Sequence, residues 1–311
     1  MAQNMSVEIC GVRLKNPVMT ASGTFGSGVE FSEFLDLNRL GAVVTKGVAL
    51  VPWEGNPVPR ICETPSGMLN AIGLQNPGVA VFAKRDLKFL EEELSRDQAG
   101  EGTKVVVNVC GHSEEEYIGC VEKLSDEPRA DLLEINISCP NVREGGIAFG
   151  TDPKGVERIT SAVRKAARQP VIMKLSPNVT SISEIAKAAE AGGADALSLI
   201  NTLTGMKIDV ERRTFALANR TGGLSGPAIH PVAVRMVYEC AQAVKIPIIG
   251  MGGIRTAEDA LEMIMAGATA VSVGTASFHD QTTVLSVIDG IEGFLERHQV
   301  SDIRDLIGCV R

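Results

Sequence analysis

The chain has 311 residues, 44% of them hydrophobic and only 4% aromatic, and it carries a formal net charge of −8. This length allows two average domains or one large α/β barrel, and the composition suits helices packed on a parallel sheet. The negative charge argues against a nucleic-acid-binding protein, which needs a basic face.

Signatures of membranes, secretion and metal binding are missing from the sequence. No apolar run approaches the roughly 20 residues of a membrane span, and the N-terminal residues lack the pattern of a secretory signal. The seven cysteines contain no C-x-x-C pair, which disfavours a structural metal or cluster site in this chain. We therefore expect no metal, reduced thiols and a cytoplasmic location.

Strand-like and helical patterns alternate along the chain, starting with a predicted β-hairpin around Cys10 and Gly11. Eight apolar strands are then predicted at residues 17–21, 42–45, 105–109, 132–137, 171–175, 196–200, 246–250 and 270–273. Alternating strands and helices indicate βαβ units. Eight such units predict an α/β fold, a (β/α)8 TIM barrel that forms a single domain over residues 1–311.

The helices between these strands are predicted from start signals and apolar stripes. One begins at Pro153 after the N-cap residue Asp152, and another follows a capping box at 181–184 and ends near Gly192. Further helices are predicted from Pro231 and between residues 256 and 267. The last helix carries a single apolar stripe, formed by Val284, Ile288, Ile291 and Leu295.

Three long connections, at 47–82, 139–150 and 201–227, follow predicted strands. Long connections in a compact domain are usually functional. In a barrel all three share the C-terminal face, where the active sites of such barrels lie. We therefore expect the chemistry at this face.

Glycine-rich turns follow the last two predicted strands, with Gly252 and Gly253 after the seventh and Gly274 after the eighth. Glycines let backbone N–H groups approach an anion closely, and barrels commonly bind a phosphate beside these two loops. Tight turns alone are the alternative, but glycines at both turns favour a phosphate site.

Two lysines lie where a ligand could pair with them. Lys174 interrupts an apolar strand, and a buried ammonium is costly unless it is paired. Lys46 ends the second strand, where a solvated lysine is an equally good interpretation. An anionic or electron-accepting ligand inside the barrel mouth would satisfy both side chains.

Four asparagines, Asn70, Asn108, Asn136 and Asn201, each lie at a strand, just past one or in a long connection. A single asparagine would cap a helix or make a turn. Four at one face would instead supply neutral donors and acceptors suited to a planar, polar heterocycle.

Cys139 ends the fourth apolar strand, directly before a glycine-rich loop. A thiol with an ordinary pKa of about 8.5 can take a proton after a modest perturbation. The four histidines fit no triad motif, which disfavours a nucleophile, and the missing ligand spacing disfavours a metal site. An inert role, as we expect for Cys10, Cys110, Cys120 and Cys240, stays open on the residues alone.

With these features the sequence resembles the class 1 dihydroorotate dehydrogenases along nearly its whole length. The motifs that carry the resemblance are 16–17 (NP), 21–26 (ASGTFG), 55–60 (GNPVPR), 70–76 (NAIGLQN), 136–141 (NISCPN) and 222–227 (GGLSGP). The resemblance implies an FMN-containing (β/α)8 barrel. It also implies oxidation of (S)-dihydroorotate to orotate in de novo pyrimidine (UMP) biosynthesis.

The resemblance also implies residue roles. Cys139 matches the base that takes a proton from C5 of the substrate, while hydride leaves C6 for the flavin N5. Substrate contacts match Lys46, Asn70, Ala71, Ile72, Gly73, Leu74, Asn136, Asn201 and Thr202. FMN contacts match Ser22, Lys46, Gly47, Asn108, Asn136, Lys174, Ile200, Gly226, Gly252, Gly253, Gly274 and Thr275. Lys174 is expected at the N1/O2 edge of the flavin, and the 139–150 loop is expected to close over the site.

Segments 21–26, 45–47 and 63–70 look like the NAD-linked class 1B type. The resemblance then implies an iron–sulfur flavoprotein partner that carries FAD and a [2Fe–2S] cluster, in a heterotetramer with two of each chain. It also implies a homodimer of this chain. One departure is Trp53, the only tryptophan, which replaces an expected arginine. Trp53 either packs against a partner or covers its own loop.

Three alternatives remain on the sequence. The first is a fumarate-linked class 1A enzyme, and the second is a dihydropyrimidine dehydrogenase-like enzyme that acts on uracil or thymine. The third is a non-catalytic barrel that binds a phosphate ligand. The combination of Lys174 and Cys139 argues against the third.

Overall fold

Eight parallel strands form a closed barrel in the computed structural model, which describes residues 3–94, 102–138, 143–144 and 147–310. The strands are β3 (Val18–Thr20), β4 (Ala42–Val44), β7 (Lys104–Val109), β8 (Leu132–Asn136), β11 (Val171–Lys174), β12 (Ala196–Leu199), β17 (Ile248–Met251) and β18 (Ala270–Val273). Each pairs in parallel with the next, and β18 pairs with β3. All eight predicted strands are confirmed, and no predicted end differs from the observed one by more than two residues.

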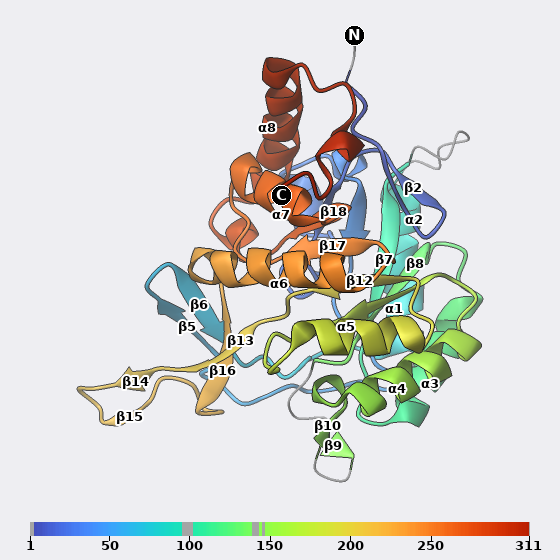
Figure 1. Ribbon diagram of the computed structural model, residues 1–311. Coiled ribbons are helices and arrows are strands. Elements are labelled where there is room, and N and C mark those ends of the chain that lie inside the picture. Colours follow the sequence, from blue (N-terminus) through green and yellow to red (C-terminus); the bar gives the residue numbers. More distant parts are fainter. Residues whose placement is uncertain (1–2, 95–101, 139–142, 145–146, 311) are drawn as a thin grey trace.

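Helices surround this barrel (Figure 1). They are α1 (Val79–Phe82), α2 (Lys88–Glu93), α3 (Glu114–Ser125), α4 (Pro153–Ala166), α5 (Ile182–Ala191), α6 (His230–Ala243), α7 (Ala257–Ala266) and α8 (Thr283–His298). The predicted starts of α4 and α5 are confirmed, because the Asp152 and Ser181 side chains accept hydrogen bonds from backbone N–H groups of the first turn.

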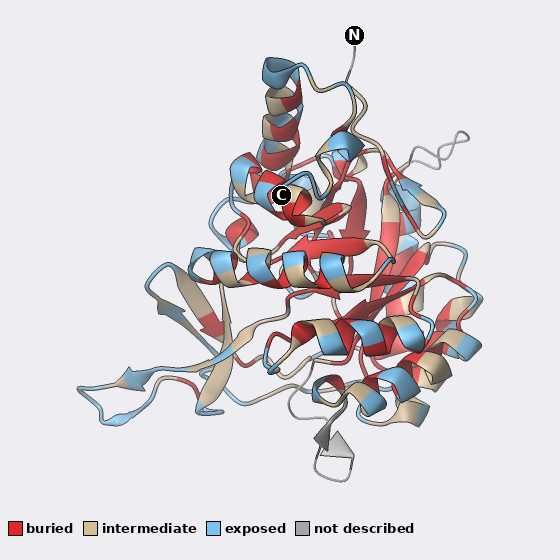
Figure 2. Cartoon of the chain, viewed as in Figure 1, coloured by how far each residue is buried: buried red, intermediate tan, exposed pale blue. Residues whose placement is uncertain are grey.

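The core lies between the barrel strands and the helices, where Figure 2 shows a continuous buried zone. Parallel strands that are covered on both faces consist of apolar runs, which is why these strands could be predicted from the sequence. The predicted stripe of α8 is buried at all four positions, Val284, Ile288, Ile291 and Leu295. Burial of each such side chain stabilises the fold by about 1.5–3 kcal/mol.

A second, antiparallel sheet is built from two of the long connections. Its order is β13 (Leu203–Met206), β16 (Thr221–Ser225), β6 (Gly67–Asn70) and β5 (Ile61–Thr64). The hairpin of β14 (Ile208–Asp209) and β15 (Thr214–Phe215), which we call the arm, projects away from the barrel (Figure 1). The sequence analysis predicted 47–82 and 201–227 as long functional connections, but it did not predict the strands within them.

Two short hairpins complete the described strands. The predicted N-terminal hairpin is confirmed as β1 (Val7–Ile9) paired with β2 (Val12–Leu14). Within the predicted 139–150 loop, β9 (Arg143–Glu144) pairs with β10 (Ile147–Ala148). None of the helices in the described part of the chain has the length and apolar character needed to cross a membrane.

Candidate active site

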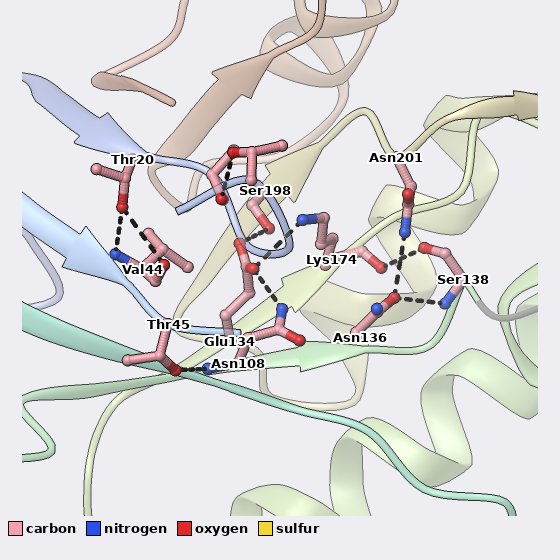
Figure 3. A network of polar contacts seen from close by, with 12 residues as sticks. Thr20, Val44, Thr45, Asn108, Glu134, Asn136, Ser138, Lys174, Ser198 and Asn201 are labelled. Carbon is pink, nitrogen blue, oxygen red and sulfur yellow. Dashed lines mark hydrogen bonds and ion pairs between the residues drawn. The ribbon is translucent and has the colours of Figure 1, made fainter. Parts of the chain in front are cut away.

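A buried carboxylate, Glu134 of β8, lies among polar side chains of three neighbouring strands (Figure 3). Asn108 of β7 donates from Nδ2 to Glu134 Oε1 over 2.6 Å. Ser198 of β12 donates to Oε2 over 2.7 Å, and the Lys174 ammonium of β11 lies 3.5 Å from Oε1. Glu134, which the sequence analysis did not single out, thus supplies the counter-charge that we expected from a ligand of Lys174.

The amide oxygen of Asn108 is buried and has no hydrogen-bond partner in the described part of the chain. A Cβ atom at Gly47 would come within 2.7 Å of this oxygen. The missing side chain at Gly47 therefore keeps the approach to a buried acceptor open. Unpaired buried acceptors are rare in folded proteins, and one is explained when a ligand supplies the missing donor.

Asn136 and Asn201 contact each other at the carboxyl ends of β8 and β12. Asn201 donates from Nδ2 to Asn136 Oδ1 over 3.2 Å, and the Ser138 N–H also donates to this oxygen. The Ser138 hydroxyl donates to the Lys174 backbone carbonyl, and the Tyr117 hydroxyl donates to that of Asn136. These bonds join both asparagines to the strand that carries Lys174, as Figure 3 shows.

Lys46 follows β4 and lies near the turn that contains Gly23, with Nζ 3.8 Å from the Cβ position of that glycine. Burial lowers the pKa of the Lys46 ammonium, and the positive charges of Lys174 and Arg60 lower it further, against an opposing effect of Cys110. Among the described residues, no acceptor forms an ion pair or hydrogen bond with Nζ. A ligand carboxylate would offset this unfavourable placement.

Asn70 lies on strand β6 of the antiparallel sheet, whereas the other three asparagines lie on or just after barrel strands. Its Nδ2 donates to the Gly223 carbonyl of the paired strand β16, over 3.4 Å. Thr202 packs against the same glycine, because a Cβ atom at Gly223 would overlap the Thr202 hydroxyl. The predicted residues Ala71, Ile72, Gly73 and Leu74 follow Asn70 in the segment after β6. The sheet therefore brings the two predicted substrate segments together.

The glycine turn after β17 packs closely against α6. Gly252 and Gly253 have positive φ angles of 128° and 72°, and a Cβ atom at either would collide with α6. Ile200 packs against Gly252, and the His230 ring contacts the Gly252 carbonyl through Nδ1 at 2.8 Å. The turn geometry alone accounts for these two glycines, so a phosphate at them stays a prediction.

The remaining predicted cofactor residues lie close to those turns. The Thr275 hydroxyl donates to Ser225 Oγ of β16, and Gly226, which follows Ser225, would collide through a Cβ atom with Gly67. Gly274 lies opposite Ala21, in the segment after β3 that also contains Ser22. Cys139, the predicted base, lies outside the described residues.

The other cysteines agree with the inert role expected for them. Burial raises the pKa of the Cys10, Cys120 and Cys240 thiols to about 12, so they stay protonated at neutral pH. Cys110 is fully buried as well. In the described part of the chain, no group of three or more His, Cys, Asp or Glu residues could hold a metal ion.

Trp53 does not merely cover its own loop. Its ring stacks on the ring of His112, which follows β7, with centroids 3.7 Å apart and planes inclined by 30°. The indole is half-buried in this arrangement. The stack ties the segment before β5 to the segment before α3.

Replacing His112 with alanine is expected to shift the emission maximum of Trp53 to longer wavelength, because the indole loses the stacked ring and more of its face meets water. The emission spectrum of this single tryptophan checks the effect, with His279→Ala as a control for an exposed histidine elsewhere. Identical emission spectra of His112→Ala and the wild type would contradict the stack.

Comparison with known proteins gives one consistent result. The family model described as dihydroorotate dehydrogenase matches residues 4–295. The chain belongs to the dihydroorotate dehydrogenase family. A relative from Lachnoclostridium phytofermentans is 66% identical over 99% of this chain and 100% of its own length. Relatives from Alkaliphilus oremlandii and Geotalea uraniireducens are 59% and 55% identical, over 98% or more of each chain. All three are named dihydroorotate dehydrogenase B (NAD(+)), catalytic subunit.

The residues at the barrel mouth fit the FMN that this family uses. The orphaned Asn108 oxygen would accept from an N–H of the flavin ring, and Lys174 would donate to a ring oxygen or nitrogen. The missing Cβ at Gly47 leaves room for a ring beside Asn108. This donor and acceptor set suits a planar heterocycle better than a metal ion.

Three polar residues of the site were not predicted from the sequence: Glu134, Ser198 and Tyr117. Glu134 had a legible signal, because a charged residue inside the run 132–137 is as anomalous as Lys174 in its own strand. Ser198 and Tyr117 had none, because small polar or aromatic residues are ordinary in strands and helices.

Proposed function

We propose that this chain oxidises (S)-dihydroorotate to orotate in de novo pyrimidine (UMP) biosynthesis, as the catalytic subunit of an NAD-linked class 1B enzyme. The observation that carries the proposal is 66% identity, along the whole chain, to a protein of that name. The geometry agrees with it, because amides and an unpaired lysine lie beside a site fitted to a flavin. In this proposal residues 1–311 act as one domain.

FMN would supply a two-electron acceptor for hydride from the substrate. In this proposal its contacts are Ser22, Lys46, Gly47, Asn108, Asn136, Lys174, Ile200, Gly226, Gly252, Gly253, Gly274 and Thr275. The N–H groups of the glycine turns hold its phosphate. Asn108 accepts from the ring, and Lys174 donates to the edge on which negative charge develops during reduction.

The substrate is held by Lys46, Asn70, Ala71, Ile72, Gly73, Leu74, Asn136, Asn201 and Thr202 in this proposal. Lys46 pairs with the carboxylate, and the asparagine amides hold the pyrimidine ring. Cys139 takes the proton from C5 as general base. The Asn136–Asn201 hydrogen bond fixes both amides before the substrate arrives, which reduces the ordering needed on binding.

Anaerobic titration with dihydroorotate tests the function directly. The purified protein should be yellow, and dihydroorotate should bleach the flavin absorbance. A colourless chain that takes up no FMN on reconstitution would rule the proposal out. Dihydrouracil and dihydrothymine serve as matched substrates without the carboxylate, and bleaching by these instead would indicate a dihydropyrimidine dehydrogenase-like enzyme.

The final acceptor is NAD+ in this proposal, reached through an iron–sulfur flavoprotein partner that carries FAD and a [2Fe–2S] cluster. The word subunit in the relatives' names supports a partner chain. We propose a cytoplasmic heterotetramer with two copies of each chain. Co-expression of both chains should yield NAD+ reduction by dihydroorotate, whereas turnover of the isolated chain with fumarate would indicate class 1A.

We also propose that two copies of this chain pair through the arm. Three large apolar side chains are exposed there, Ile208, Val210 and Phe215, and Val210 is 74% exposed. Met206, at the end of the adjoining strand β13, is exposed as well. Exposed apolar patches of this kind mark interfaces in soluble proteins. Sedimentation of the wild type beside Val210→Asp checks the pairing, because the charge should shift a dimer toward monomer.

Lys46 predicts a specific pH dependence of orotate binding. Only the protonated ammonium attracts the carboxylate, and its pKa lies below the usual lysine range because of burial. Orotate affinity should therefore fall with rising pH, starting below about pH 10.4 and by up to about tenfold per pH unit beyond the pKa. Flavin difference spectra with orotate between pH 7 and pH 10 measure this effect.

Lys46→Met and Lys46→Arg provide the controls for this titration. The methionine variant should bind orotate weakly at every pH, without the high-pH fall. The arginine variant keeps its charge throughout the range and should lose the fall as well. A pH dependence that persists in Lys46→Met would assign it to another group.

A further inference from the structure

Glu134 is a buried carboxylate whose described partners are all donors. Its side chain is 1% exposed and that of Lys174 is 6% exposed. Both carboxylate oxygens are engaged, Oε1 by Asn108 and Lys174 and Oε2 by Ser198. An ionised carboxylate accepts all of these contacts, whereas a protonated one would place a donor against donors. Glu134 and Lys174 therefore form an ion pair inside the barrel.

This carboxylate fixes the orientation of the Asn108 amide. A carboxylate only accepts hydrogen bonds, so Asn108 must turn its Nδ2 toward Glu134. The amide oxygen then lies beside Gly47 and has no partner among the described residues. A neutral residue at 134 could accept or donate, and the amide would lose this constraint.

The same carboxylate offsets the charge of Lys174. The ammonium has three donors, and Glu134 is its only hydrogen-bond acceptor among the described residues. At least one donor is left for the FMN ring, yet the ring faces a pair whose net charge is zero. Charge interactions are strong in a buried site, so a negative group there opposes the negative charge that a flavin gains on reduction.

We propose that Glu134 is a positioning residue that orients Asn108 and Lys174 for FMN and holds the reduction potential of the bound flavin down. A low flavin potential favours onward transfer of electrons to a weak oxidant such as NAD+. The inference rests on the proposed function for the presence of FMN. It concerns a residue to which neither the sequence motifs nor the family comparison assigns a role.

The test compares the flavin potential in Glu134→Gln with that in the wild-type holoenzyme. Glutamine keeps the size and hydrogen-bonding capacity of the side chain and removes its charge. The ratio of the FMN dissociation constants, oxidised over reduced, should rise at least tenfold. That ratio corresponds to a potential more positive by about 30 mV for two electrons. Dye-equilibrated redox titration measures the potential, and titration of apoprotein with FMN measures the dissociation constant.

The double variant Glu134→Gln/Lys174→Gln separates charge from general disturbance of the site. It restores a net charge of zero, so its potential should return toward that of the wild type. Thr160→Val removes a buried hydrogen bond within α4, to the Val156 carbonyl, and controls for lost stability. If Glu134→Gln yields no folded protein, Glu134→Met takes its place. It removes the same charge from a side chain of similar length, so it should also raise the potential.

The outcomes separate this inference from the proposed function. A wild-type protein that holds FMN and is bleached by dihydroorotate, with an unchanged potential in the folded Glu134 variant, overturns the inference alone. A wild-type protein that binds no FMN overturns both. A rise in potential that persists undiminished in the double variant also overturns the inference, because the Lys174 charge would then be irrelevant.

Discussion

Replacing Cys139 with alanine is expected to slow the reduction of bound flavin by dihydroorotate by about a hundredfold to ten-thousandfold at neutral pH. General-base catalysis contributes on this order, and alanine cannot accept the C5 proton. FMN binding should persist, because Cys139 is assigned to the substrate proton and not to the cofactor. Stopped-flow absorbance under anaerobic conditions measures the reduction rate separately from any later electron transfer.

Cys139→Ser and Cys309→Ala complete this experiment. Serine is a much weaker acid than cysteine, so its variant should regain activity only as the pH rises. Cys309 is exposed and lies near the C-terminus, so its alanine variant controls for the loss of a thiol as such. An unchanged reduction rate in Cys139→Ala would remove this residue from the role of base.

Replacing Lys174 with methionine is expected to lower the free energy of unfolding by about 3–5 kcal/mol. The substitution leaves Glu134 as a buried carboxylate without its counter-charge, and breaking a buried ion pair from one side has this cost. Urea unfolding measured with and without added FMN checks the loss in each state. The loss should be present in both, because the ion pair lies within the protein.

The double variant Lys174→Met/Glu134→Gln should recover most of this stability, since no buried charge is then left unpaired. Lys187→Met, at an exposed position of α5, should change the free energy of unfolding by less than about 0.5 kcal/mol. A loss of similar size in the single and the double variant would indicate that lysine packing, and not the ion pair, sets the stability.

The barrel was predictable because its strands are apolar and local in sequence. Each parallel strand is covered on both faces, so its residues form an apolar run. A run such as 105–109 therefore predicts a strand without any information about the strands that pair with it. Caps at Asp152 and Ser181 marked helix starts for an equally local reason. The charges of Lys46 and Lys174 pointed to a site because they interrupt or end such runs.

The antiparallel sheet was not predictable from the same signals. Strands β6 and β16 contain Gly67, Gly222 and Gly223, and glycine is depleted in strands because it has no side chain to pack. Their pairing joins segments far apart in the chain, which no local pattern encodes. Glu134 had a local signal, a charge inside the apolar run 132–137, but its partners on three other strands are brought together only by the fold.

The antiparallel sheet also determines how early in synthesis the predicted substrate site can form. Asn70 and its partner Gly223 are separated by 153 residues, and the pairing of β6 with β16 holds one predicted substrate segment against the other. A chain emerging from the ribosome carries the first segment long before the second has been synthesised. Contacts of such separation form late because loop closure must come first. A nascent chain therefore carries the local β5–β6 hairpin with the β16 edge of β6 unpaired until residues 221–225 have been synthesised. An unpaired strand edge of this kind is open to pairing with other chains.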